Sequence, residues 1–363
     1  MAILKYILSF IPLLLLCSCY TDFEPALETK PVLCMNSLLT SGEPVEVSLT
    51  HTWRFSAGKP DNRDINVADA DIEVYANGRF IENLVYDPGD ADDKNSRQPV
   101  YRGQFVPSPD DQIELRAHHP SYGEAFASVV MPRPVPITKV TPDIEFTNCL
   151  PSSYINTYTL KTGFITEFTD PGETDNYYTV EVSVKNPKPI PSDVLVTIWP
   201  DNTQKYVDYT GNYQFDRIDF EREPIFSEHL SNIDHLLDSS AWGYSFFSDQ
   251  QINGKSYPLQ IHLIDCLYYV LNPKHIESLY HSEIIISLGS ISADYYKYML
   301  SMWKVNSGFE GELGNNGLAD PIFIYSNVST GAGIVAARSV SKYTVDLSDY
   351  VRDLPYQDFN PTK

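Results

Sequence analysis

The sequence predicts a mainly β protein built from two β-sandwich-like, immunoglobulin-like domains, the second carrying one packed helix. Three observations carry this prediction. The 363-residue chain holds 25 Tyr, 17 Phe and 26 Pro, and aromatic residues favour strands whereas proline interrupts helices. Short stretches of alternating apolar and polar residues, such as 44–50, recur along the chain. The clearest helical period of apolar residues falls near 292–305.

The first 19 residues have the pattern of a lipoprotein signal. Lys5 precedes an apolar run that ends at Leu16, and this run is shorter than the roughly 20 residues that cross a bilayer. In Leu16-Cys17-Ser18-Cys19, Leu stands three positions before Cys19 and small residues lie between them, which is the lipobox pattern. We therefore expect residues 1–18 to be removed and Cys19 to carry the lipid anchor, followed by a polar tether over 19–31.

The predicted anchor fixes the expected location. Asp22 and Glu24 lie just after Cys19, an arrangement that resembles the surface-export signal of Bacteroidota lipoproteins. We expect a lipid-anchored protein of the outer membrane on the cell surface, with the periplasmic face as the alternative.

The balance of charges excludes one class of partner. Lys and Arg number 26 against 48 Asp and Glu, a net charge of −22. Such a chain is repelled by phosphate backbones and by anionic lipid head groups, so nucleic-acid binding is disfavoured and the acyl chains attach the protein to the membrane. Cys34, Cys149 and Cys266 show neither metal-ligand spacing nor a disulfide framework, which leaves a single disulfide or isolated thiols.

The first domain is expected over 32–131. Strand patterns occur at 44–50, 71–75, 80–86, 100–106, 112–117 and 124–131. Asn77-Gly78 offers the positive φ angles of a tight hairpin turn. Residues 132–136 hold three prolines that alternate with Arg133 and Val135, and we interpret them as a stiff linker between the domains.

The second domain is expected over 137–350, with a tail over 351–363. Strand patterns occur at 137–146, 159–168, 177–184, 193–199, 259–263, 283–288 and 322–325, and at 333–344 after a glycine-rich turn. A short helix is predicted over 227–237. In the main helix, Ser292 is the expected N-cap. The predicted apolar stripe that packs on the sheet consists of Tyr295, Tyr298, Met299, Met302 and Trp303.

Short motifs in a fixed order resemble a known family. The chain is similar to the Bacteroidota lipoprotein family known as domain of unknown function 4249. The motifs lie at 36–39, 42–47, 67–72, 168–171, 176–178, 247–249, 253–254, 292–298, 325–328 and 331–334. The resemblance covers about residues 30–345, although Val335 stands where the family pattern has an aromatic residue. It implies a surface accessory lipoprotein associated with TonB-dependent outer-membrane transporters, which is an association and not a mechanism.

No catalytic constellation emerges, and we expect a protein that is not an enzyme. A G-x-S-x-G elbow is missing, and His275 and His281 are too far apart for a zinc helix. One candidate Ca²⁺ loop gathers oxygen ligands, although its spacing is not that of an EF-hand and a solvated loop is the simpler interpretation. These candidate metal residues are Asp87, Asp90, Asp92, Asp93 and Asn95. No other cofactor is expected.

Aromatic residues between 200 and 248 form the other candidate site. Tyr and Trp supply rigid contact area at binding surfaces, although filling a sandwich core is the more ordinary use. The candidate ligand-facing residues are Tyr206, Tyr209, Tyr213, Trp242 and Tyr244. Together the sequence predicts a non-enzymatic binding or accessory component of a TonB-dependent uptake system, whose ligand it does not identify. The alternative is a structural or adhesive surface module without a transporter partner.

Overall fold

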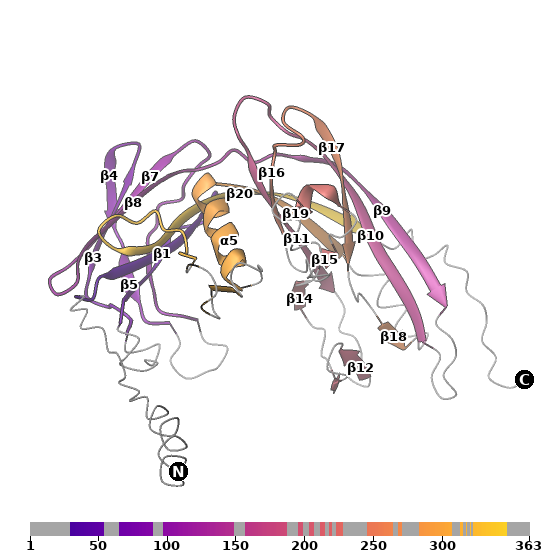
Figure 1. Ribbon diagram of the computed structural model, residues 1–363, viewed down its shortest axis with the longest axis horizontal. Helices are drawn as coiled ribbons and strands as arrows, with labels where there is room; N and C mark the ends of the chain where they lie inside the picture. The colour runs from indigo at the N-terminus through magenta and orange to yellow at the C-terminus, as the bar shows by residue number, and fades with distance from the viewer. Residues whose placement is uncertain are drawn as a thin grey trace, which may run out of the picture.

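Strands make up most of the secondary structure in the computed structural model of the chain (Figure 1). The structure describes residues 30–53, 65–89, 97–148, 157–186, 245–263, 283–306 and 322–346, together with short pieces between them. The all-β prediction is confirmed for this part of the chain. Within it, no helix is long and apolar enough to span a membrane.

The N-terminal strands form two antiparallel arrangements around one core. Strands β4, β3, β7 and β8 pair in that order, while β1, β2, β6 and β5 follow one another in a second sheet. Their bounds are β1 Leu33–Thr40, β2 Glu46–His51, β3 Asp71–Ala76, β4 Arg79–Asn83, β5 Val85–Asp87, β6 Val100–Arg102, β7 Gln112–His119 and β8 Gly123–Val130. Alternate residues of β3 and β7 are buried, as the sandwich pattern requires. The predicted hairpin is confirmed, because Asn77 and Gly78 have φ angles of 53° and 76°.

The later strands form a second core between two larger sheets. Among the described residues, one sheet runs β14-β11-β19-β20 and continues into β1, with β16 paired to β11; the other runs β15-β17-β10-β18, with β9 paired to β10. Their bounds are β9 Ile137–Asn148, β10 Thr157–Thr169, β11 Tyr177–Asn186, β14 Gly211–Gln214, β15 Ile218–Asp219, β16 Phe246–Ser248, β17 Ser256–Leu263, β18 Tyr268–Val270, β19 Glu283–Ile291 and β20 Ala332–Asp346. Strands β12 Leu195–Ile198 and β13 Thr203–Tyr206 pair separately.

One strand, β20, belongs to both halves of the molecule. It first pairs in parallel with β1, from Ala332 to Arg338, and then antiparallel with β19 as far as Asp346. Figure 1 shows it passing from the N-terminal strands to the C-terminal group. Val335 accordingly lies in the N-terminal core and Val345 in the second core. The domain limits expected from the sequence stay a prediction, but one continuous sheet connects the two cores.

Two local expectations before β20 were wrong, the second only in part. Residues 322–325 form no strand, and the expected glycine-rich turn is shorter than predicted: the chain bends at Thr330 and Gly331, but Gly333 lies inside β20. Apolar residues at 322–325 resemble a strand in sequence.

The predicted helix is confirmed as α5, Ala293–Asn306. Its N-cap is also confirmed, since the Tyr295 N–H donates to Ser292 Oγ at 3.3 Å. The expected stripe is confirmed in part: Met299 and Trp303 pack against the second core, and they are joined by Tyr296 and Leu300, which were not predicted. Apolar residues cover most of this helix, so their period did not select one face. The predicted helix 227–237 lies outside the described residues apart from Ser227, which ends the 3₁₀ turn η2 (Pro224–Ser227).

Candidate functional site

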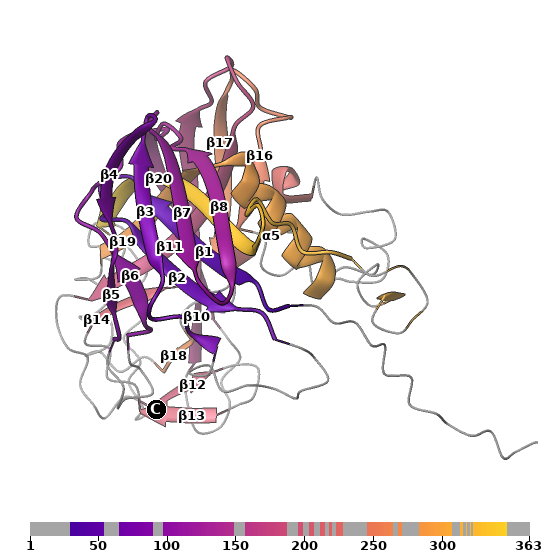
Figure 2. The ribbon, with the colours of Figure 1, turned by 90° about the vertical axis from the view of Figure 1, so that its left-hand side faces the viewer.

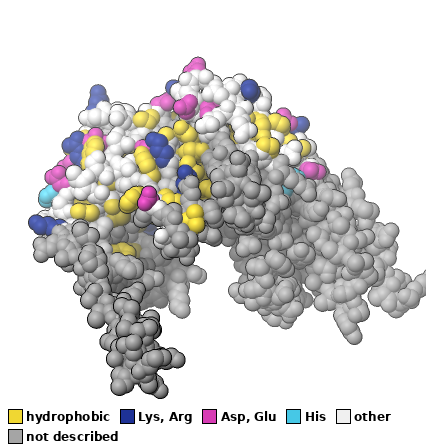
Figure 3. Space-filling model, in the orientation of Figure 1, with side chains coloured by type: hydrophobic (Ala, Val, Ile, Leu, Met, Phe, Trp, Pro, Cys, Tyr) yellow, Lys and Arg dark blue, Asp and Glu magenta, His cyan; other side chains and the backbone are white. Residues whose placement is uncertain are grey.

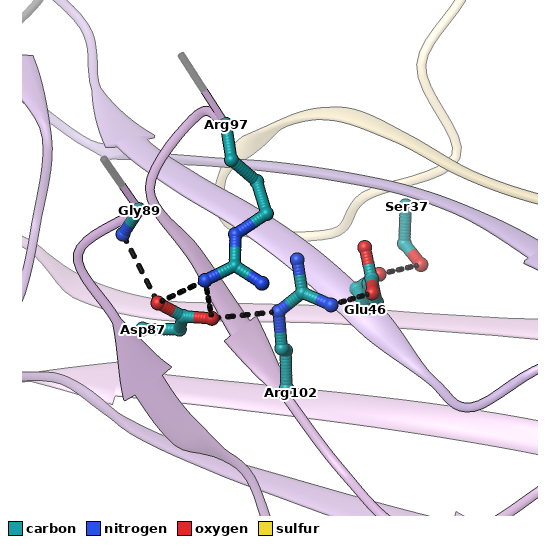
Figure 4. A network of polar contacts seen from close by, with 6 residues as sticks. All are labelled: Ser37, Glu46, Asp87, Gly89, Arg97 and Arg102. Atoms are coloured by element: carbon teal, nitrogen blue, oxygen red, sulfur yellow. Dashed lines mark hydrogen bonds and ion pairs between the residues drawn. The ribbon is translucent and has the colours of Figure 1, made fainter. Parts of the chain in front are cut away.

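Asp87, the first residue of the candidate Ca²⁺ loop, binds cationic side chains of the protein (Figure 4). Its carboxylate accepts the Gly89 N–H at 3.0 Å and lies 3.2 Å from Arg97 Nη2 and 3.0 Å from Arg102 Nε. The Gly89 N–H, aided by the two guanidinium groups, lowers the pKa of Asp87 below its usual range. The loop spacing gave no sign of this pairing, although both arginines lie close to Asp87 in sequence.

The contacts of Asp87 continue across four neighbouring strands. Arg102 on β6 also forms an ion pair with Glu46 on β2. Ser37 on β1 donates its hydroxyl to the Glu46 carbonyl oxygen at 2.6 Å. This order, β5-β6-β2-β1, is the order of the strands in the sheet. The network therefore ties the edge of the sheet together, and a metal at Asp87 would compete with two arginines.

The other sequence-predicted site residues lie mostly outside the described residues. These are Cys19, Asp90, Asp92, Asp93, Asn95, Tyr209, Trp242 and Tyr244. Tyr206 ends β13 opposite Leu195, and Tyr213 on β14 lies opposite Val184. The lipidation, metal and ligand-facing roles of these residues stay predictions. Within the described part of the chain, no three His, Cys, Asp or Glu side chains gather in a way that can hold a metal ion.

Two family motifs meet at a pair of buried carboxylates, which we call the carboxylate node. Asp170 follows β10 and Asp249 follows β16, and each is 2% exposed. Asp170 accepts the Tyr178 hydroxyl at 2.5 Å through Oδ1 and the Gly254 N–H at 2.8 Å through Oδ2. Asp249 Oδ2 accepts the Asn176 N–H at 2.9 Å. A buried carboxylate needs such donors because it has lost its hydration.

The backbone around the carboxylate node is packed too closely for side chains. A Cβ on Gly172 would lie 2.8 Å from the Gly254 Cα, and Gly254 itself has a φ of +70°. Burial raises the pKa of the Asp249 carboxyl, and the Asn176 N–H only partly offsets this. The motif residues at 168–178 and 247–254 thus fasten two turns of the second core to each other.

Three further motifs meet where α5 approaches β20, in what we call the helix–strand node. Asn327 forms both hydrogen bonds of a strand pair with Val335: Oδ1 accepts its N–H at 2.9 Å and Nδ2 donates to its carbonyl oxygen at 2.8 Å. The Tyr325 hydroxyl donates to Asp294 Oδ1 at 2.5 Å. Burial, with this hydrogen bond, raises the pKa of Tyr325 to about 12. Ser292 Oγ accepts the Ala337 N–H at 3.2 Å. Side-chain hydrogen bonds, and not the backbone pairing of a β-strand, therefore hold residues 325–327 in place.

The same node reaches the N-terminal strand β1. Asn36 Oδ1 accepts the Ile334 N–H at 3.1 Å. Gly333 has a φ of +107°, and a Cβ there would lie 2.2 Å from the Met35 carbonyl oxygen. Residues almost 300 positions apart are joined here, which the order of the motifs in the sequence does not reveal. The sequence feature that came nearest to indicating these contacts was the recurrence of Asn, Asp and Gly within the motifs. Asn and Asp side chains form hydrogen bonds to backbone groups, and Gly permits backbone conformations with positive φ.

A family model described as Domain of unknown function (DUF4249) matches residues 20–344. No curated protein and no solved structure gives a match. The match covers nearly the whole chain and includes every motif in the two nodes. The chain therefore belongs to the DUF4249 family.

Proposed function

We propose that the protein is a lipoprotein of the outer membrane, displayed on the cell surface, that acts as a non-enzymatic binding or accessory component of a TonB-dependent uptake system. The observation that carries the proposal is the lipobox at Leu16–Cys19, directly before residue 20, where the family match begins. A signal that ends where the family domain begins supports export and anchoring of the domain as a unit.

The two nodes support a binding scaffold. Their polar side chains form hydrogen bonds to backbone groups and to each other. Asp170 bonds to Gly254, Asn36 to Ile334, and Asn327 to Val335. Motifs that maintain a fold favour a protein whose function lies on its surface. Charges of both signs are interspersed on the face in Figure 3, although the net charge of the chain is −22.

Lipidation is tested first, by metabolic labelling with a palmitate analogue in the native host. Cys19→Ala is expected to lose the label and to leave the membrane fraction. Cys17→Ala is the matched control and is expected to keep both. Loss of the label in Cys17→Ala with retention in Cys19→Ala, or no label in the wild type, would contradict the anchor at Cys19.

The transporter is tested by purifying the tagged full-length lipoprotein from its native outer membrane in mild detergent. A TonB-dependent transporter at near one-to-one ratio is the expected result. Recovery of the lipoprotein alone in several detergents would contradict a stable complex. That result would favour the structural or adhesive surface module instead.

A further inference from the structure

The outer face of the sheet β4-β3-β7-β8 carries an unusual share of apolar surface. In Figure 2 this sheet faces the viewer with no other strand in front of it. Of ten exposed large apolar side chains in the described part of the chain, four belong to β4 and β8. These are Phe80 (52% exposed), Ile81 (39%), Phe126 (38%) and Val130 (56%).

Four of the side chains on this face form one continuous strip across all four strands. The Phe80 ring on β4 meets the Tyr75 ring on β3 edge to face, with centroids 5.6 Å apart. The Arg116 guanidinium on β7 lies 4.3 Å from the Tyr75 ring centroid and 6.0 Å from that of Phe126 on β8. We call these residues, Phe80, Tyr75, Arg116 and Phe126, the aromatic strip. Exposed aromatic and arginine side chains are the types that dominate protein interfaces.

Acidic side chains border the aromatic strip. The strand register places Asp71, His118 and Glu124 in one row beyond it. Glu73 stands beside Arg116, and Glu114 stands beside Tyr75. Glu114 forms an ion pair with Arg116, so the remaining border is negative. An apolar centre within a negative rim is complementary to a surface with an apolar recess and a Lys or Arg rim.

Other occupants fit this face less well. A sugar needs open aromatic faces, but the Arg116 guanidinium already covers one face of Tyr75. A second copy of the chain would present the same negative rim, which is not complementary to this one. An added strand at β4 is disfavoured, because the register shifts between Val74 and Tyr75, and such bulges disrupt edge pairing.

We propose that the aromatic strip is the docking surface for a protein partner with an apolar recess and a basic rim. This inference rests on the proposed function, which identifies the partner as the transporter of the uptake system. Phe80 and Phe126 act as its anchors, and the acidic rim orients the approach.

The test is the same detergent purification, carried out with variants of the full-length lipoprotein. The first variant joins Phe80→Ser with Phe126→Ser, and Phe323→Ser is its control because Phe323 is 86% exposed outside this sheet. The second variant is Glu124→Lys, with Glu173→Lys, an exposed acid of the other half, as control. The readout is the molar ratio of transporter to lipoprotein.

We expect the ratio to fall at least about tenfold for the double variant, to fall also for Glu124→Lys, and to stay unchanged for both controls. Unchanged ratios in all four would overturn the docking surface and leave the proposed function intact. Loss of self-association in the double variant, with the transporter retained, would assign the face to a second copy and overturn the proposal. If the wild type recovers no transporter, the proposed function fails, and the partner assigned here fails with it.

Discussion

Asp249 shows how a single carboxylate of the family motif affects stability. It is 2% exposed and accepts the Asn176 N–H, yet burial raises its pKa above the usual value. The folded protein therefore binds this proton more tightly than the unfolded chain does. Ionised Asp249 costs stability, and this cost is absent below the unfolded pKa of about 3.9 and grows as the pH rises through the folded pKa.

Asp249→Asn removes that titration while keeping an acceptor for the Asn176 N–H. We expect the free energy of unfolding of the variant, relative to wild type, to increase from pH 4 to pH 7. Urea unfolding at several pH values measures this difference. Glu173→Gln, which removes an exposed acid in the turn just before Asn176, is the control. A relative stability of Asp249→Asn that falls with pH would show that the ionised carboxylate is the favourable form.

Gly333 is the residue on which the approach of β20 to β1 depends most directly. Gly333→Ala places a Cβ 2.2 Å from the Met35 carbonyl oxygen at a φ of +107°. We expect a loss of about 2 to 4 kcal/mol in the free energy of unfolding. Gly42→Ala is the control, because Gly42 also has a positive φ but nothing within 4 Å of its Cβ; it is expected to cost about 1 kcal/mol. Equal losses in the two variants would mean that the strands separate easily.

At the scale of elements, two hydrogen bonds of Ser292 fix the start of α5 and its position beside β20. The Ser292 hydroxyl caps the helix through Tyr295 and accepts the Ala337 N–H of β20. Ser292→Ala is expected to lower the free energy of unfolding by about 2 kcal/mol. Ser292→Thr keeps the hydroxyl and should recover most of the loss. If threonine fails to recover it while the structure is retained, packing of the small side chain is the main contribution.

The elements also show what the sequence could predict. A two-residue hairpin and a helix cap depend on residues next to each other, so Asn77-Gly78 and Ser292 were predicted correctly. The packed face of α5 was predicted only in part, because Tyr296 and Leu300 lie among other apolar residues that differ little in hydrophobicity. The partners of Asp87 were missed for a related reason. A cluster of carboxylates attracts arginines and metals alike, and sequence spacing does not show which is near.

On the scale of the whole molecule, the decisive contact is the parallel pairing of β1 with β20. Cys34 lies opposite Ala332, and Thr40 lies opposite Arg338. The apolar pattern predicts β20 from residue 333 onward but assigns no strand to 33–40, and such patterns carry no information about which strand lies beside which. The carboxylate node was unpredictable in the same way, since Asp170 and Gly254 meet only in the fold. The sequence therefore indicated the class of fold, and the structure supplied its connections.

This pairing makes the N-terminal core dependent on the far end of the chain. Val328, Val335 and Ala337 complete a core whose other members lie within residues 33–131. A fragment of residues 30–135 leaves one edge of β1 unpaired and opens the core where these side chains pack. We expect it to unfold without a cooperative transition in urea, monitored by circular dichroism.

The same fragment should recover cooperativity when the missing strand is returned. Residues 325–340 are placed before residue 30 through a Gly/Ser linker, which must run back along the whole paired length because parallel strands start at the same end. Residue 340 lies in register about 12 positions beyond residue 30, so a linker of about 20 residues covers the distance with slack at roughly 3.3 Å each. The fusion should unfold in one transition, and Val335→Asp within it should abolish the transition by burying a charge in the core. Cooperative unfolding of residues 30–135 alone would instead show that the N-terminal core forms independently of β20.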